Sequence, residues 1–292
     1  MEEELIEAFD NFVIGNFQAV LDLAQAREGK RGSTEFSQVM WASICARCHL
    51  ALGHMDKVRE YAKSSSAALA ATAYFAVFQR SQEDPQRKAA ALEKIITAAN
   101  QSNGEPVSCY YACVARAMAG DVMDAINYGK AVSASSPAEF NALRAQFCLM
   151  INRIDLASKT LAEAAANRDD SAAAKLVTAM HLIVSGRPNE ACMSYSDLIA
   201  QFNAAEIKTA LPLANGRAVG NIQRGMFAEA AEDLEETADE NPDSLRNLIC
   251  CLSWQGKRRE ALVALDRLGK LDSAHALLHE TRRLSQAFAQ FA

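Results

Sequence analysis

Residues 225–242 read GMFAEAAEDLEETADENP, and this stretch decides the fold. Gly225 is followed by Phe227 two positions later, by Ala230 five positions later and by Pro242 seventeen positions later. Glycine adopts the positive φ that ends a helix in a tight corner, and alanine lets two helices approach closely. Proline stops a helix because it has no amide hydrogen. The stretch predicts two antiparallel helices joined at a corner, an aromatic side chain packed at that corner and a stop after the second helix.

The same corner recurs along the chain as a turn-forming residue followed five positions later by Ala or Val. The stretches that carry it are GNFQAV (15–20), GHMDKV (53–58), DPQRKA (84–89), GDVMDA (120–125), NRIDLA (152–157), GRPNEA (186–191) and GKRREA (256–261). Together with Gly225, these corners are 31 to 39 residues apart, about 34 on average, which is the length of a tetratricopeptide (TPR) repeat. Asn and Asp replace Gly at two corners, since both tolerate a left-handed backbone. We expect an all-α, TPR-like α-solenoid of about eight antiparallel helix pairs.

One more amphipathic helix is expected after the last pair, at about residues 272–291. Its apolar side chains are Leu277, Leu278, Leu284, Phe288 and Phe291. A terminal repeat needs such a capping helix because its outer face is otherwise apolar and exposed. No Gly/Ser-rich linker interrupts the repeats, so the sequence predicts a single TPR-like superhelical domain over residues 1–292.

Composition and charge argue against several classes of protein. The chain of 292 residues is 50% hydrophobic and 23% charged, which predicts a folded protein. A formal net charge of −6 disfavours nucleic acid as a partner, and we expect the basic run at residues 257–259 to be a solvated corner. The acidic start lacks a secretory signal, and no apolar run is long enough to span a membrane. We therefore expect a cytoplasmic protein whose eight cysteines are reduced and mostly buried.

Residues 44–50, ICARCHL, contain the attachment signature of a c-type haem, Cys45-x-x-Cys48-His49. In the frame of the second repeat, Cys45, Ala46 and His49 take three packing positions of a first helix, and Cys48 falls between them. A reactive dithiol also needs a helix N-terminus, which the mid-helix Cys45 lacks. We expect packing and no cofactor. A haem or redox enzyme stays as a rival class, which a Soret band or a titratable dithiol would reveal.

No other pattern predicts catalysis or metal binding, so we expect the protein not to be an enzyme. His275 and His279 lie one helical turn apart but have no third ligand nearby in sequence. Cys109 and Cys113 have the same spacing and share a face with apolar residues. The chain contains neither of the glycine-rich phosphate loops.

In TPR solenoids the first helix of each pair lines the concave face, and here its lining positions are mostly apolar. The candidate partner-binding residues are Tyr74, Phe78, Tyr110, Val114, Gln146, Leu149, Leu176, Met180, Ile183, Asn215, Val219 and Ile222. A clamp for an acidic C-terminus needs paired Lys, Arg and Asn, and the first two pairs offer only Arg47, so a chaperone-tail receptor is not expected. A long apolar face left empty favours aggregation. We expect a protein partner to cover it; alternatively, these side chains bury against one another.

Two stretches resemble a particular TPR-like family. Residues 9–25, FDNFVIGNFQAVLDLAQ, are similar to the opening repeat of the epsilon-COP family, the small helical-repeat subunits of the coatomer (COPI) coat. Residues 241–268, NPDSLRNLICCLSWQGKRREALVALDRL, resemble the late repeat of that family, which runs N-P-D-x-L-x-N-L and then a short G-K turn.

The resemblance implies a non-enzymatic coat subunit whose superhelix clasps the C-terminal domain of alpha-COP and meets other coatomer subunits indirectly. It also implies a cytoplasmic protein, peripheral on Golgi membranes and COPI-coated vesicles, that contacts the membrane only through the coat. The implied process is Golgi-to-ER retrograde and intra-Golgi transport. A cytosolic TPR adaptor for another assembly shares every architectural feature and remains the alternative.

Overall fold

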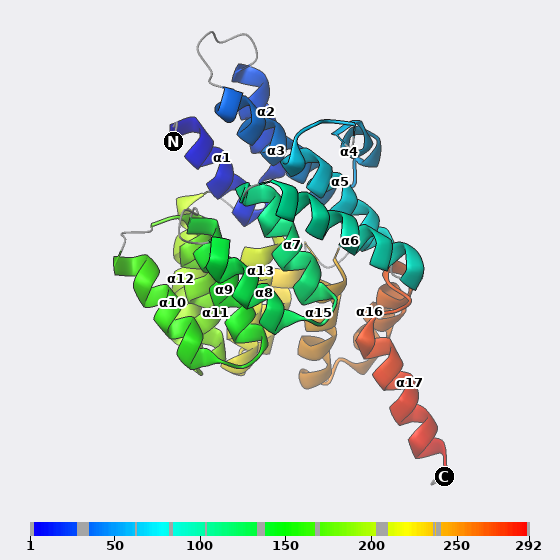
Figure 1. Cartoon of the computed structure of the whole chain (residues 1–292). Coiled ribbons are helices and arrows are strands. Elements are labelled where there is room, and N and C mark those ends of the chain that lie inside the picture. Colours follow the sequence, from blue (N-terminus) through cyan, green and yellow to red (C-terminus); the bar gives the residue numbers. More distant parts are fainter. Residues whose placement is uncertain are drawn as a thin grey trace. The chain divides into compact units, whose positions relative to one another are not determined.

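The computed structural model describes residues 3–27, 35–61, 63–81, 84–102, 104–132, 138–166, 170–202, 210–235, 237 and 241–290. These residues form seventeen α-helices and contain no strand (Figure 1). The predicted all-α solenoid of eight helix pairs with a further C-terminal helix is confirmed. The chain divides into two compact units, Met1–His181 and Leu182–Ala292, here called unit 1 and unit 2. The single-domain organisation stays a prediction.

Each pair consists of an odd-numbered first helix and an even-numbered second helix. The pairs are α1 (Glu3–Ile14) and α2 (Phe17–Arg27), α3 (Glu35–Ala51) and α4 (Met55–Tyr61), α5 (Ala67–Arg80) and α6 (Pro85–Gln101), α7 (Pro106–Met118) and α8 (Val122–Val132), α9 (Ala138–Met150) and α10 (Ile154–Ala166), α11 (Ala172–Val184) and α12 (Pro188–Gln201), α13 (Leu211–Gln223) and α14 (Phe227–Glu235), and α15 (Pro242–Trp254) and α16 (Arg258–Leu271). The last helix is α17 (Ala276–Ala289).

Seven of the eight predicted corners have the left-handed backbone that the pattern requires. Six are glycines, and the seventh is Asn152 with a φ of 57°. At Gly225, whose φ is 77°, the amide of Met226 donates to the carbonyl of Asn221 over 2.9 Å, which is the hydrogen bond of a Schellman corner. Phe227 packs at this corner and stacks on Trp254, with ring centroids 5.5 Å apart.

The predicted corner at Asp84 is wrong. Its φ is −119°, and its carboxylate caps α6 by accepting a hydrogen bond from the amide of Arg87 over 3.0 Å. The cause is Pro85, because a residue that precedes proline is driven to extended backbone. The sequence frame recurs at this place, but the chain turns here through an N-cap instead of a left-handed residue.

The core of unit 1 centres on the pairs from α5 to α10, where aromatic rings pack against alanines. Ala71, Ala112 and Ala115 are fully buried, so these helices approach closely. The core of unit 2 joins α13, α14, α15, α16 and the start of α17. Abundant alanine therefore serves helix packing, as the repeat pattern indicates.

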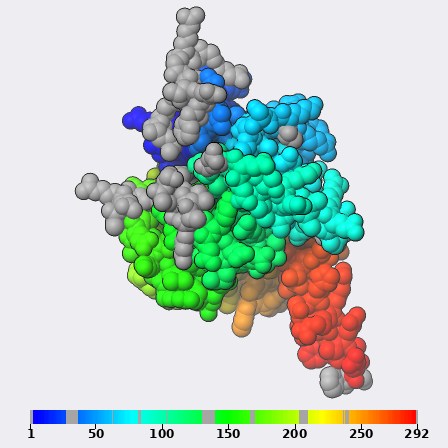
Figure 2. Space-filling model, in the orientation of Figure 1, coloured from blue at the N-terminus to red at the C-terminus, as the bar shows by residue number. Residues whose placement is uncertain are grey.

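The C-terminal helix α17 covers the last pair with only its first two turns. Leu278 is buried and Leu277 is half-buried in the core of unit 2. Leu284 is 49% exposed and Phe288 is 72% exposed, on the helix shown in red in Figure 2. Phe291 lies outside the described residues. The predicted cap is thus limited to the start of α17, where Leu277 and Leu278 pack in the core of unit 2.

Candidate partner-binding surface

The predicted partner-binding residues lie on the first helices of five pairs. They are Tyr74 and Phe78 on α5, Tyr110 and Val114 on α7, Gln146 and Leu149 on α9, Leu176, Met180 and Ile183 on α11, and Asn215, Val219 and Ile222 on α13. Those from Tyr74 to Met180 belong to unit 1, and the others belong to unit 2. None is exposed, because Phe78 and Leu176 are buried and the rest are half-buried. Their contact with a partner stays a prediction.

The aromatic members of this set already have partners within unit 1. Phe78 is fully buried, and its ring stacks on that of Phe75 at 6.0 Å. Tyr110 meets the edge of Phe140 at 6.3 Å and an angle of 90°. The ammonium of Lys94 lies 5.6 Å from the ring centre of Tyr74. Tyr110 joins two neighbouring pairs through Phe140 on α9, whereas the contacts of Phe78 and Tyr74 lie within the pair of α5 and α6. These rings therefore already pack within unit 1, in line with the alternative that the side chains bury against one another.

Arg47 is the arginine that the sequence placed on the inner face, and the structure buries it to 2% exposure. Its guanidinium lies 4.4 Å from the ring centre of Phe12 on α1 and 4.7 Å from that of Tyr110 on α7. Such cation–π contacts contribute most when the cation is removed from water. Arg47 therefore links α1, α3 and α7 inside unit 1, and no local sequence signal points to that role.

The first helix also reaches the later pairs of unit 1. The Oδ1 atom of Asp10 accepts a hydrogen bond from the amide of Ala172 over 2.9 Å, although the two residues are 162 positions apart. Ala172 is the first residue of α11, so Asp10 satisfies one of the amides that a helix leaves open at its start. Val13 packs against a cluster that includes Leu149 and Met180. Part of the predicted face is thus covered by α1.

In unit 2, the predicted residue Asn215 bonds to the next first helix. Its Nδ2 atom donates to the hydroxyl of Ser244 over 2.8 Å, and its Oδ1 atom accepts from Nδ2 of Asn247 over 3.2 Å. Both partners lie on α15. The amide of Asn215 therefore aligns two neighbouring inner helices, a structural role that sequence reasoning did not identify.

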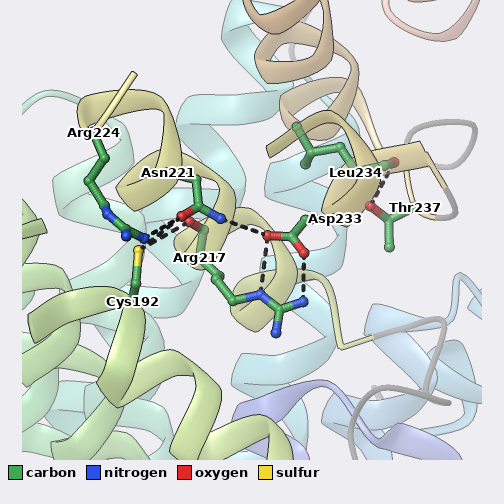
Figure 3. A network of polar contacts seen from close by, with 7 residues as sticks. All are labelled: Cys192, Arg217, Asn221, Arg224, Asp233, Leu234 and Thr237. Atoms are coloured by element: carbon green, nitrogen blue, oxygen red, sulfur yellow. Dashed lines mark hydrogen bonds and ion pairs between the residues drawn. The ribbon is translucent and has the colours of Figure 1, made fainter. Parts of the chain in front are cut away.

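A polar network on the other side of α13 fixes how this helix is rotated (Figure 3). Arg217 donates to Asp233 on α14 through Nε and Nη2, over 3.1 and 2.6 Å. Asn221 donates to the same carboxylate over 3.3 Å, and the thiol of Cys192 on α12 donates to Oδ1 of Asn221 over 3.5 Å. Because the side chain of Asp233 is only 13% exposed, water screens this pair weakly. The network ties α13 to its two neighbours in unit 2.

The haem-like motif on α3 is packing. Cys48 and Ala46 are fully buried, His49 is 8% exposed and Cys45 is half-buried, so the expectation that Cys48 falls between the packing positions is wrong. Burial raises the pKa of Cys48 to about 12, with a further rise from Cys45, so its thiol stays protonated at neutral pH. Burial also lowers the pKa of His49, with smaller effects of Lys57 and His54. A thiol that stays protonated is a poor nucleophile.

Within the described ranges, no three His, Cys, Asp or Glu side chains cluster in a way that could hold a metal ion. The same ranges contain no helix with the length and hydropathy that crossing a membrane requires. Two open grooves lie along the helices. One of 690 Å³ lies between α5 and α6, and one of 510 Å³ is lined by α14, α15 and α16. Tyr74 is the one predicted residue among their lining side chains.

Comparisons with known proteins identify both a family and a fold. The family model described as the coatomer epsilon subunit matches residues 1–292. The crystal structure of the APC/C hetero-tetramer Cut9–Hcn1 contains a chain that matches with a TM-score of 0.66 and 10% identity, over 94% of this chain and 53% of that one. A tetratricopeptide repeat protein from Parabacteroides merdae ATCC 43184 matches with a TM-score of 0.57 and 14% identity, over 97% and 98% of the two chains.

The present chain thus spans about half of the matching chain in the Cut9–Hcn1 structure. At these identities the two solved structures show the fold alone. No curated protein sequence matches this chain.

Proposed function

The chain belongs to the coatomer epsilon-subunit family, and from that premise we propose that it clasps the C-terminal domain of alpha-COP as a structural subunit of the COPI coat. The observation that carries this proposal is the family match over residues 1–292, the whole length of the repeat array. In this role the protein stiffens and positions its partner, and it catalyses no reaction. It works in the cytoplasm on Golgi membranes and vesicles, in Golgi-to-ER and intra-Golgi transport.

The inner helices supply the chemistry for such a contact. Gln146, Val114 and Met180 are half-buried on three successive first helices of unit 1, and they offer apolar surface with a single amide. In unit 2, Val219 and Ile222 are half-buried on α13. A surface of this kind suits a folded partner with an apolar centre, because it carries no paired cations for a free carboxylate.

The first experiment is affinity purification of the tagged full-length protein from cells. Coatomer subunits should co-purify at equal stoichiometry, because a coat subunit is part of a permanent complex. Recovery of a different assembly in their place would support the alternative, a TPR adaptor, and would refute the coat role.

The second experiment tests the inner face with two identical substitutions. Gln146→Lys places a charge on the half-buried face of α9, and Gln86→Lys places the same charge on an exposed position of α6. Only Gln146→Lys should weaken binding of an alpha-COP C-terminal segment, by at least tenfold, because a charge within an interface must lose its water. Binding should also raise the melting temperature of the unaltered chain. Equal affinities for the two variants would place the contact elsewhere.

A further inference from the structure

Helix α1 makes two contacts of very different strength within unit 1. On one side, Leu5 and Ala8 are buried in an apolar cluster with Val20 on α2 and Ile44 on α3. The corner that leads from α1 into α2 folds back onto the end of α1, because the amides of Gly15 and Asn16 donate to the carbonyls of Phe12 and Asn11. This side of α1 belongs to the core of its own repeat.

The other side of α1 meets α9 and α11 through a much smaller contact. Its apolar part is Val13, which packs against the cluster formed by Ala142, Ala145, Ala173 and Val177. Its polar part includes the hydrogen bond from the Ala172 amide to the carboxylate of Asp10. Three of the four buried residues in that cluster are alanines, which present a low-relief surface from which a single valine can separate without repacking either side.

We propose that this contact is a clasp, which opens and closes while the repeats of unit 1 stay folded, and which must open before a partner reaches α9 and α11. The inference rests on the proposed function, in which a partner binds the inner face. Its structural basis is that Val13 packs against the same buried cluster as Leu149 and Met180, two predicted contact residues. A partner that covers this cluster on α9 and α11 therefore has to take the place of Val13.

The clasp also defines what the incoming segment looks like. It replaces Val13 with an aliphatic side chain, and it replaces Asp10 with a hydrogen-bond acceptor for the first amide of α11.

The test uses the full-length protein and a matched pair of substitutions. Asp10→Ala removes the acceptor for the Ala172 amide, whereas Asp10→Asn keeps a carbonyl oxygen at the same position. Hydrogen exchange is followed in residues 170–178, which report the clasp, and in residues 106–118 of α7, which report the rest of unit 1. Asp10→Ala should raise exchange in residues 170–178 by about threefold to tenfold and leave α7 unchanged. Asp10→Asn should raise exchange in residues 170–178 less than Asp10→Ala does, because it keeps the acceptor for the Ala172 amide.

The same proteins are then mixed with the alpha-COP C-terminal segment, and the association rate is measured. If opening of the clasp limits how fast the segment binds, Asp10→Ala raises the association rate by the same factor as it raises hydrogen exchange. In the unaltered protein, the bound segment lowers the protection of residues 3–14 from hydrogen exchange. Equal exchange in all three proteins, or a joint rise in α7, overturns the clasp. Faster exchange with an unchanged association rate overturns its role in entry.

The two proposals fail in different ways. If the segment binds none of the three proteins, the proposed function is refuted, while the exchange data still decide whether the clasp opens. If the segment binds and residues 3–14 become more protected, α1 is part of the interface and the clasp is refuted, while the proposed function stands.

Discussion

Two helical glycines of unit 2 allow a sharp test of the packing that fixes α13, the helix that carries Asn215 and Val219. A Cβ atom added at Gly216 would lie 2.1 Å from Cζ and 2.3 Å from Cε1 of Tyr195, whose side chain is 1% exposed. A Cβ atom added at Gly269 on α16 meets only Cδ1 of Leu278, at 3.8 Å, which is an ordinary contact. The same substitution should therefore have opposite effects at the two sites.

Gly216→Ala forces a buried ring to move, and overpacking of this kind costs about 3 kcal/mol at the upper end of its usual range. The helix preference of alanine over glycine returns about 1 kcal/mol, which leaves a net loss of about 2 kcal/mol. Gly269→Ala gains the same helix preference without a clash and should raise the free energy of unfolding by about 1 kcal/mol. The two variants should thus differ by about 3 kcal/mol, in opposite directions from the unaltered protein.

Urea unfolding followed by circular dichroism measures both effects. With a typical slope, a loss of about 2 kcal/mol lowers the midpoint by about 1 M. The double variant Gly216→Ala with Tyr195→Leu should lose less stability than the sum of the single variants, because the smaller side chain removes the clash. A Gly216→Ala protein that is as stable as Gly269→Ala would show that the ring of Tyr195 does not pack on α13 as described.

Three further predictions concern the last helix, the corners and the buried thiols. Leu278→Ala should lower the free energy of unfolding by about 2–3 kcal/mol, because Leu278 is buried. Leu284→Ala, at a site 49% exposed, should change it by no more than about 0.5 kcal/mol. Equal losses of the two variants in urea titrations would mean that α17 is packed along its whole length. Gly225→Ala should cost about 1–2 kcal/mol because φ is 77° there, and an unchanged melting temperature would argue against the left-handed corner. Burial raises the pKa of Cys48 and Cys113 from 9.0 to about 12, so the folded state keeps these protons at a pH where the unfolded state loses them. The contribution of these thiols to the free energy of unfolding should be fully present below pH 9, and above pH 9 it should fall by up to about 1.4 kcal/mol per thiol and pH unit. Cys48→Ala should therefore flatten the decline in melting temperature between pH 9 and 10.5. An identical decline in the variant and the unaltered protein would contradict the raised pKa.

The helix pairs could be predicted because each corner is a local event. A glycine at the corner and an Ala or Val five positions later are close in sequence, and the positive φ at Gly53, Gly120 and Gly186 agrees with that pattern. The failure at Asp84 is equally local, since Pro85 overrides the repeat frame. The sequence contained that proline, but the expectation weighted the frame above it.

The candidate surface was less predictable because it depends on distant contacts. Position in the repeat correctly placed Tyr110 and Leu149 on first helices, yet it gave no sign that α1 lies over α9 and α11. The hydrogen bond from Ala172 to Asp10 has no signature that a single sequence reveals. The sequence places Arg47 at a lining position where a single arginine cannot form a carboxylate clamp, and only the tertiary structure shows that aromatic rings enclose it.

The contact between Asp10 and Ala172 also sets an order of events during folding. Neighbouring helix pairs form from residues close in sequence, so they fold early, whereas a link across 162 residues must wait for chain closure. At about 5–20 residues per second, a ribosome needs on the order of 10–30 s to make the intervening chain. Once α2 and α3 have been made, α1 can fold onto them, while Val13 still lacks the cluster on α9 and α11. A nascent or truncated chain that ends before α11 therefore contains sound repeats with one open apolar seam, and that seam is where a chaperone would bind or where two unfinished chains would associate.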